Sequence, residues 1–267
     1  MNELPRSLDY MLAATIREMS YRRKPMNLDS ALSLNGSVAL VTGGSRGIGY
    51  GIAATLTTLG ANVVITGKNA NRVTAAAREL SANGAGCEGV VCDVTSLPAV
   101  DAFAKHVRDK YGRIHILVNN AGIGGPASLL HELPPEKWDE IFDTNVRGVF
   151  YMVQAIVPLM LTAGSGHIVN ISSLAGKNPL PRGAAYSSSK WALNGLSYSL
   201  AEELRGQNIR VSVVCPGSVD TEFSPHTGKN TDRMLRPEDI GHIVAMLVTQ
   251  RTHSFVSEVL VRPTQKP

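Results

Sequence analysis

The sequence predicts an α/β fold with a mostly parallel sheet. Short runs of β-branched residues alternate with helix-length amphipathic stretches along the chain. The runs also lack a polar residue at every second position, as expected when helices cover both faces of a sheet. This alternation favours right-handed crossovers between parallel strands. No linker or internal repeat divides residues 37–267, so they are expected to form one domain.

Each element is predicted from its own residues in chain order. The strands, identified as short apolar runs rich in β-branched residues, are Val38–Val41, Val63–Thr66, Gly89–Val94, Ile114–Val118, His167–Ile171, Val211–Val214 and Val256–Val261. The helices, identified as amphipathic stretches between those runs, are Ile48–Leu59, Arg72–Ala82, Pro98–Tyr111, Pro135–Leu161, Ala185–Arg205 and Pro237–Thr249.

The composition of the 267-residue chain excludes several classes of protein. Hydrophobic residues make up 43% and charged residues 18%, which excludes an intrinsically disordered chain. No run of about 18 uncharged apolar residues is present, so no membrane-spanning helix is expected. The net charge of +4 is not gathered in a basic stripe, which argues against nucleic-acid binding.

The cysteines and the start of the chain bear on its location. Cys87, Cys92 and Cys215 form neither a CxxC pair nor an even set, so we expect reduced thiols and no metal site. Residues 1–19 contain acidic side chains and no continuous apolar stretch, which is atypical of a secretory signal. A cytoplasmic protein is therefore expected.

Residues 1–36 are expected to form an extension that precedes the catalytic domain. Apolar residues recur in it at helical spacing: Leu8, Met11, Leu12, Ile16 and Met19. This spacing predicts one amphipathic helix. We expect the helix to pack on the body or on a neighbouring subunit, and attachment at a membrane surface is the alternative.

A glycine-rich loop follows the first strand and opens the first helix. Its sequence, Thr42-Gly43-Gly44-Ser45-Arg46-Gly47-Ile48-Gly49, has the spacing TGxxxGxG. Glycines allow the backbone to approach a bulky anion, and a helix N-terminus presents unpaired N–H groups to it. After a strand and before a helix, such a loop predicts a pyrophosphate site.

The end of the second strand indicates which dinucleotide binds. Sites for NAD usually place a carboxylate there, to accept hydrogen bonds from the ribose hydroxyls. This chain has Gly67 followed by Lys68 and Asn69, and Arg46 in the glycine loop adds a second cation. Two cations without a carboxylate favour the 2′-phosphate of NADP, whereas a solvated surface lysine is the simpler alternative.

Polar residues also follow the third, fourth and fifth strands. Asp93-Val94 ends the third, and Asn119-Asn120-Ala121-Gly122 ends the fourth. Ligands of parallel α/β sheets bind at this edge, which favours cofactor-lining positions. Ser173 ends the fifth strand, and the next helix carries Tyr186 and Lys190, which share one face because they are four residues apart. A nearby ammonium would favour the phenolate and make the tyrosine a proton-transfer group.

Together, in this order, the motifs TGxxxGxG, NNAG, a serine and YxxxK resemble the classical short-chain dehydrogenase/reductase family. The similarity covers about residues 35–262 and includes Asn145 and the pair Pro216-Gly217. It implies a Rossmann-type, doubly wound sheet of seven strands and a homotetramer or homodimer.

The resemblance also implies roles for individual residues. Tyr186 would be the general acid in carbonyl reduction, Ser173 would hold the carbonyl oxygen, and Asn145 would bind a water linked to Lys190. Lys190 would bind the nicotinamide ribose and lower the pKa of Tyr186. The implied cofactor-lining residues, with the cations inferred above, are Gly43, Ser45, Arg46, Gly47, Ile48, Gly49, Lys68, Asn69, Asp93, Val94, Asn120, Ala121, Gly122, Tyr186, Lys190, Pro216, Gly217, Val219 and Thr221.

The expected activity is reversible hydride transfer from NADPH to a ketone or aldehyde. Reduction of a 3-oxoacyl thioester, including one on acyl-carrier protein, is the alternative within the same class. The segment Ser218–Arg236 is short and polar for that alternative, and the chain lacks the glycine-rich ending usual there. A regulatory protein that binds NADP without catalysis is the alternative from another class.

Overall fold

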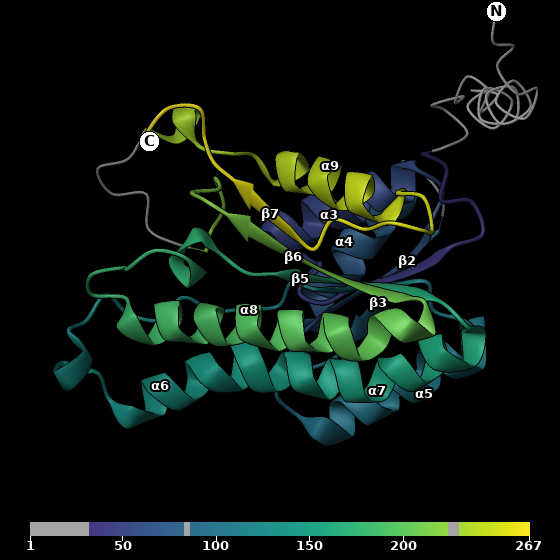
Figure 1. The fold of residues 1–267 in the computed structure, drawn as a ribbon, viewed down its shortest axis with the longest axis horizontal. Helices are drawn as coiled ribbons and strands as arrows, with labels where there is room; N and C mark the ends of the chain where they lie inside the picture. Colours follow the sequence, from purple (N-terminus) through teal and green to yellow (C-terminus); the bar gives the residue numbers. More distant parts are fainter. Residues whose placement is uncertain (1–31, 83–85, 224–229) are drawn as a thin grey trace, which may run out of the picture. The chain divides into compact units, whose positions relative to one another are not determined.

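The sheet has seven strands, all parallel, in the order β3-β2-β1-β4-β5-β6-β7 (Figure 1). The computed structural model describes residues 32–82, 86–223 and 230–267. The strands are β1 (Val38–Val41), β2 (Asn62–Gly67), β3 (Cys87–Val91), β4 (Ile116–Asn119), β5 (Gly166–Ile171), β6 (Ile209–Pro216) and β7 (Glu258–Val261). The predicted doubly wound α/β fold is confirmed.

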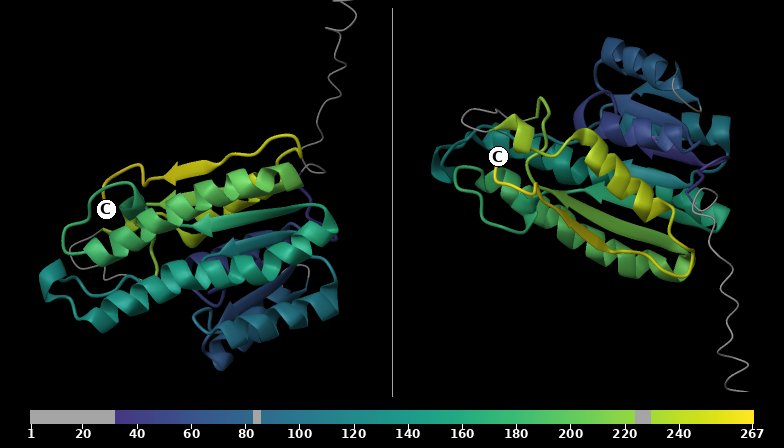
Figure 2. Two further views of the ribbon diagram at one scale, coloured as in Figure 1. Left: turned by 60° about the horizontal axis from the view of Figure 1, so that its bottom comes forward. Right: turned by 90° about the horizontal axis from the view of Figure 1, so that it is seen from above.

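Helices cover both faces of the sheet (Figures 1 and 2). They are α3 (Gly47–Thr58), α4 (Ala70–Ala82), α5 (Leu97–Tyr111), α6 (Pro135–Phe142), α7 (Gly148–Ala163), α8 (Ala184–Leu204) and α9 (Pro237–Val248). One core lies under α3, α4 and α9, and the other under α5, α7 and α8. In β1, Ala39 and Val41 belong to the first core, and Val38 and Leu40 to the second. Both faces of the strand are therefore apolar, as the lack of polar alternation predicts.

Helix α5 illustrates how local sequence sets the ends of an element. Ser96 caps its start, because the Ser96 hydroxyl accepts a hydrogen bond from the Ala99 N–H at 3.4 Å. Pro98 occupies the first turn, where its missing N–H costs no helical hydrogen bond. Gly112 ends the helix with a φ of +68°, a conformation that glycine adopts without steric cost.

The order of the strands creates a crevice beside β1. The chain runs from β1 outward to β2 and β3, and then returns to place β4 on the other side of β1. The loops that leave the carboxyl ends of β1 and β4 therefore diverge over opposite faces of the sheet. Residues 42–46 and 120–125 border this crevice.

The predicted helix Pro135–Leu161 is not α-helical throughout. A π-helical turn, Asp143–Arg147, separates α6 from α7. In a π turn, backbone hydrogen bonds span five residues instead of four, so one extra residue is accommodated without a break. Amphipathic spacing does not distinguish such a turn from regular α-helix, which is why the sequence predicts one element.

The helical stretch Pro135–Ala163 is long and apolar enough to cross a membrane by length and composition alone. This finding differs from the expectation that the chain offers no such segment. These two criteria are weak evidence of a span, because core helices also meet them. Met152, Ile156 and Met160 of this stretch are buried in the core beneath the sheet.

Two further expectations concern the ends of predicted segments. The amphipathic helix predicted within residues 1–36 has its apolar residues outside the described part of the chain. Of the described residues in this extension, Leu34 is buried, and its N–H donates to the Leu59 carbonyl at 2.7 Å. The strand β3 ends at Val91 rather than at Val94. The Asp93 carboxylate accepts hydrogen bonds from the N–H and hydroxyl of Thr95, which turns the chain away from the sheet.

Candidate active site

The glycine loop between β1 and α3 is tied to the loop that follows β4. The Thr42 hydroxyl accepts hydrogen bonds from the N–H groups of Asn120 and Ala121, each at 3.0 Å. In the other direction, Asn120 Nδ2 donates to the carbonyls of Thr42 and Gly43 at 2.9 and 3.2 Å. Asn120 thus holds the glycine loop in place, a function that its predicted cofactor-lining role did not include.

Glycine is required in this loop by conformation and by space. Gly43 and Gly47 have φ angles of +64° and +53°. A Cβ on Gly49 would lie 2.9 Å from the carbonyl carbon of Gly43 and closer still to Asn120 Nδ2. The helix α3 then begins at Gly47, and the Arg46 side chain makes no capping hydrogen bond to it. The geometry therefore fits the pyrophosphate of a dinucleotide, which uncapped N–H groups and the helix dipole stabilise.

Positive side chains gather at the carboxyl end of β2, where the sequence predicts the 2′-phosphate site. Lys68 Nζ lies 3.1 Å from Asp93 Oδ2, and Arg46 Nη1 lies 2.6 Å from Glu222 Oε2. The Arg72 guanidinium lies 3.8 Å from the same Glu222 oxygen. Arg72 is not among the predicted site residues, although its place four residues after Lys68 puts it in the first turn of α4.

The position of Gly67 has little space for a side chain of the kind that NAD sites carry. A Cβ on Gly67 would lie 3.0 Å from Val73 Cγ2 and 3.3 Å from Ser45 Oγ. A carboxylate could extend from this position only if Val73 and Ser45 moved. Asn69, predicted to line the cofactor, accepts a hydrogen bond from the Arg72 N–H at 3.0 Å and so caps the start of α4.

The other predicted cofactor residues divide between the crevice and the core. Val94 is buried and packs against the start of α7, because a Cβ on Gly148 would lie 2.8 Å from its Cγ2. Pro216 is the last residue of β6, and the Gly217 N–H donates to the Val261 carbonyl at 2.8 Å. Val219 forms a bridge with Leu235. Thr221 is the member of this group nearest the glycine loop, beside Gly47.

Three of the predicted catalytic residues come together from two segments of the chain. Tyr186 and Lys190 lie on α8, and Ser173 lies two residues beyond the end of β5. Lys190 Nζ lies 5.8 Å from the centroid of the Tyr186 ring. The Ser173 side chain lies close enough to Tyr186 to lower the pKa of the phenol, and its Oγ accepts a hydrogen bond from the Ala175 N–H at 3.1 Å. The four-residue spacing on α8 thus brings the phenol and the ammonium together, and the turn after β5 adds the serine hydroxyl to the same site.

Asn145 lies in the π turn and is fully engaged with the protein. Its Oδ1 accepts a hydrogen bond from the Ile123 N–H at 2.9 Å, and its Nδ2 donates to the Ile123 carbonyl at 2.9 Å and to Ser189 Oγ at 3.0 Å. These contacts join the loop after β4 to α8. The water-binding role implied by the resemblance stays a prediction.

The electrostatics of the pair Tyr186 and Lys190 differ from expectation. Burial raises the pKa of Tyr186, and the nearby Ser173 side chain only partly opposes this effect. Burial lowers the pKa of Lys190 to about 8. The Lys190 ammonium donates to the Ile171 carbonyl at 2.9 Å. The net direction for the pKa of Tyr186 is therefore opposite to the expected one, and the depression of this pKa by Lys190 stays a prediction.

The lowered pKa of Lys190 predicts a pH-dependent stability. The folded protein loses this proton near pH 8, whereas the unfolded chain holds it until about pH 10.5. Stability due to Lys190 therefore rises with pH between these values, by on the order of 3 kcal/mol. Urea unfolding of the wild type and of Lys190→Met should show the wild type gaining stability relative to the variant from pH 7.5 to 10. Parallel pH profiles would contradict this assignment.

Phe223 and a small hollow border the tyrosine. The Phe223 ring packs against the Tyr186 ring, with centroids 5.9 Å apart. A small hollow next to Tyr186 is lined by apolar groups, among them Leu133 and Ile141, and by the polar side chains of Ser128 and Arg182. Sequence analysis missed Phe223, because no motif marks the packing of one aromatic ring on another.

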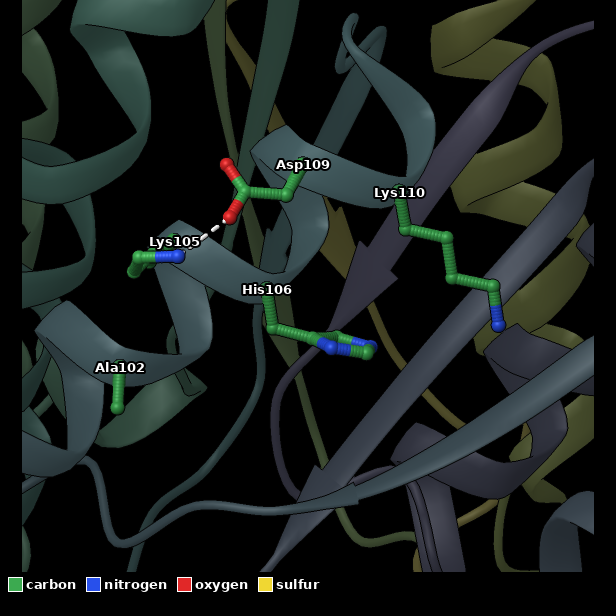
Figure 3. A pocket seen from close by; sticks show the side chains of 5 residues that line it. All are labelled: Ala102, Lys105, His106, Asp109 and Lys110. Carbon is green, nitrogen blue, oxygen red and sulfur yellow. Dashed lines mark hydrogen bonds and ion pairs between the residues drawn. The ribbon is translucent and has the colours of Figure 1, made fainter.

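Another cavity is remote from this site. It measures about 470 Å³ and lies on the outer face of α5, where Ala102, Lys105, His106, Asp109 and Lys110 line it (Figure 3). All five residues belong to one helix, and Lys105 is paired with Asp109 at 2.6 Å. Among the described residues, no group of three histidine, cysteine or acidic side chains is placed to hold a metal ion.

Comparison with known proteins agrees with this geometry. The family model of short chain dehydrogenases matches residues 37–232. An uncharacterized oxidoreductase of Staphylococcus saprophyticus is 37% identical over 233 residues, which are 87% of this chain and 99% of the relative. A metagenomic short-chain oxidoreductase, crystallised with NADP, is 47% identical with a TM-score of 0.78 over 88% of this chain and 100% of that one.

A third similar structure is a variant of the actinorhodin polyketide ketoreductase with NADPH, at 32% identity and a TM-score of 0.78. It covers 85% of this chain, and 95% of its own length is matched. Fold, order of motifs and family match lead to one conclusion. The chain belongs to the short-chain dehydrogenase/reductase family of oxidoreductases.

Proposed function

We propose that the protein is an NADP(H)-dependent carbonyl reductase that acts reversibly on a ketone or aldehyde. The observation that carries this proposal is the cluster of Arg46, Lys68 and Arg72 near Gly67. This cluster lies at the carboxyl-terminal edge of the sheet, as does the tyrosine site. Three cations suit a phosphate, and Gly67 leaves no carboxylate to receive the hydroxyls of NAD.

The chain's own residues supply the proton and the geometry. NADPH, when bound, supplies the hydride. The Ser173 and Tyr186 side chains would hydrogen-bond the substrate carbonyl oxygen, where negative charge develops during reduction. Tyr186 would then donate its proton to that oxygen. The raised pKa of Tyr186 keeps the phenol protonated at neutral pH, which is the state required of a donor.

The hollow beside Tyr186 is small and combines apolar groups with Ser128 and Arg182, which favours a small substrate. A 3-oxoacyl thioester is the second candidate, and the similarity to a polyketide ketoreductase favours it. The two candidates differ in how much of the substrate must lie outside the hollow.

The test is oxidation of NADPH, followed by absorbance, against a panel of ketones, aldehydes, diketones and 3-oxoacyl thioesters, with NADH in parallel. Turnover of small carbonyls with NADPH preferred supports the proposal. Turnover of thioesters alone would replace it with the second candidate. Failure with the whole panel would support a regulatory protein that binds the cofactor without catalysis.

We further propose that the enzyme is a cytoplasmic homodimer or homotetramer. Support comes from Phe150, Leu161 and Trp191, large side chains exposed on α7 and α8. The three cysteines are free thiols in the structure. Light scattering should give a mass of two or four chains, and the mass of a single chain would overturn the oligomeric part of the proposal.

A further inference from the structure

Three consecutive residues, Thr221 to Phe223, lie across the candidate site. Thr221 lies beside the glycine loop, since a Cβ on Gly47 would be 3.3 Å from its methyl group. Phe223 packs on the catalytic Tyr186 and also on Gly124, whose Cβ would lie 3.2 Å from its ring. Glu222 lies between these two contacts in the chain, so its position is coupled to that of Phe223.

The Glu222 carboxylate occupies the place where the 2′-phosphate is expected. A single oxygen, Oε2, lies 2.6 Å from Arg46 Nη1 and 3.8 Å from Arg72 Nη1. These two guanidinium groups are the cations that the proposed function assigns to the phosphate. A phosphate cannot take both of them while the carboxylate remains. In this conformation the anion held by the two arginines is therefore the protein's own Glu222 carboxylate.

This internal ion pair is easily displaced. The side chains of Arg46 and Glu222 are 56% and 69% exposed. Exposed pairs contribute little to stability and are screened by salt. A phosphate monoester carries up to two negative charges and three acceptor oxygens, and arginine binds such groups bidentately. The 2′-phosphate of NADP is therefore a stronger partner for the two arginines than Glu222 is, whereas the 2′-hydroxyl of NAD is not.

We propose that Glu222 is a positioning residue that couples the 2′-phosphate site to the catalytic tyrosine. Displacement of its carboxylate by the phosphate moves Phe223 away from Tyr186 and opens the site to substrate. A cofactor without the phosphate leaves Glu222 paired and Phe223 in contact with Tyr186. Selection of NADP(H) thus arises in turnover as well as in binding. This inference rests on the proposed function.

The binding test compares Glu222→Gln with Glu140→Gln, in which a surface carboxylate paired with Lys137 on α6 is removed with the same change of net charge. Adenosine 2′,5′-bisphosphate and 5′-AMP serve as probes in calorimetry. The bisphosphate should bind Glu222→Gln about two- to fivefold more tightly than the wild type, the range expected for loss of an exposed ion pair. Binding of 5′-AMP, and both probes with Glu140→Gln, should be unchanged.

The coupling test uses turnover and a fluorescent reporter. In Glu222→Gln, the ratio of kcat with NADH to kcat with NADPH should rise at least about threefold. Phe223→Trp places a reporter against Tyr186, whose emission the bisphosphate should shift and 5′-AMP should not. In the double variant that carries both Glu222→Gln and Phe223→Trp, the shifted emission should appear without ligand. A merely structural Glu222 would change neither the kcat ratio nor the emission.

The outcomes separate the inference from the proposed function. If the bisphosphate binds the wild type more tightly than 5′-AMP but Glu222→Gln alters neither affinity nor the kcat ratio, the inference is overturned alone. If the bisphosphate binds no more tightly than 5′-AMP to any variant, the proposed preference for NADP is overturned, and the inference with it.

Discussion

Replacing Tyr186 by phenylalanine should lower carbonyl turnover by about 10²–10⁴-fold while leaving NADP⁺ binding intact. The substitution removes the phenolic proton but keeps the ring that packs on Phe223. The Ser173 hydroxyl cannot replace the lost proton, because an aliphatic hydroxyl is a far weaker acid than a phenol. Lys190 Nζ already donates a hydrogen bond to the Ile171 carbonyl. Steady-state kinetics with NADPH and calorimetry with NADP⁺ measure the two effects separately.

A matched control for this variant lies on the same helix. Tyr198 is exposed on α8 and its hydroxyl donates to Glu258 at 2.8 Å, far along the helix from Tyr186. Tyr198→Phe should keep its turnover within about twofold of the wild type, because surface changes of this kind have small effects. A Tyr186→Phe enzyme with near-wild-type turnover would remove Tyr186 from the mechanism.

Gly49→Ala should destabilise the protein and weaken the binding of NADP⁺ together. The added Cβ would meet the Gly43 carbonyl and the Asn120 amide inside van der Waals contact. Asn120 is the residue that ties the two loops at the crevice, so relief of the clash must separate them. Overpacking of this kind costs typically 1–3 kcal/mol. The dissociation constant for NADP⁺ should rise at least about tenfold, which corresponds to ~1.4 kcal/mol.

Gly195→Ala is the control with the opposite sign. Gly195 lies in α8 with nothing within 4 Å of the position that a Cβ would occupy. Alanine in a helix interior is more stable than glycine by about 1 kcal/mol, so this variant should unfold at higher urea concentration and bind NADP⁺ normally. Equal destabilisation by the two substitutions would show that the close approach at Gly49 does not control the loop.

Sequence patterns predict those features that depend on local periodicity or on a fixed position at a strand end. The strands of this sheet are buried on both faces, so their apolar runs are evident without a structure. The YxxxK spacing places Tyr186 and Lys190 on one helical face, because helix geometry alone determines it. The glycine loop is predictable for the same reason, since a strand, a glycine turn and a helix follow one another directly.

Features that depend on contacts between distant segments are not predictable in this way. The pairing of Glu222 with Arg46 joins residues 176 positions apart. The raised pKa of Tyr186 arises from burial, which depends on what covers the phenol and not on its neighbours in the chain. Asn69 illustrates a different limit, because one asparagine after a strand can contact a cofactor or cap the next helix, and the structure shows the cap.

The π turn at Asp143–Arg147 makes this stretch sensitive to a change in its length. One residue of an α-helix corresponds to a rotation of about 100° around its axis. Loss of a single residue would convert the turn to regular α-helix and rotate all of α6 by that angle relative to α7. Ile141, now buried beside the substrate hollow, would then leave the core. The extra residue is therefore maintained by two constraints at once, the orientation of Asn145 and the inward face of α6. Insertions and deletions should be tolerated in the loops that flank this stretch and rejected within it.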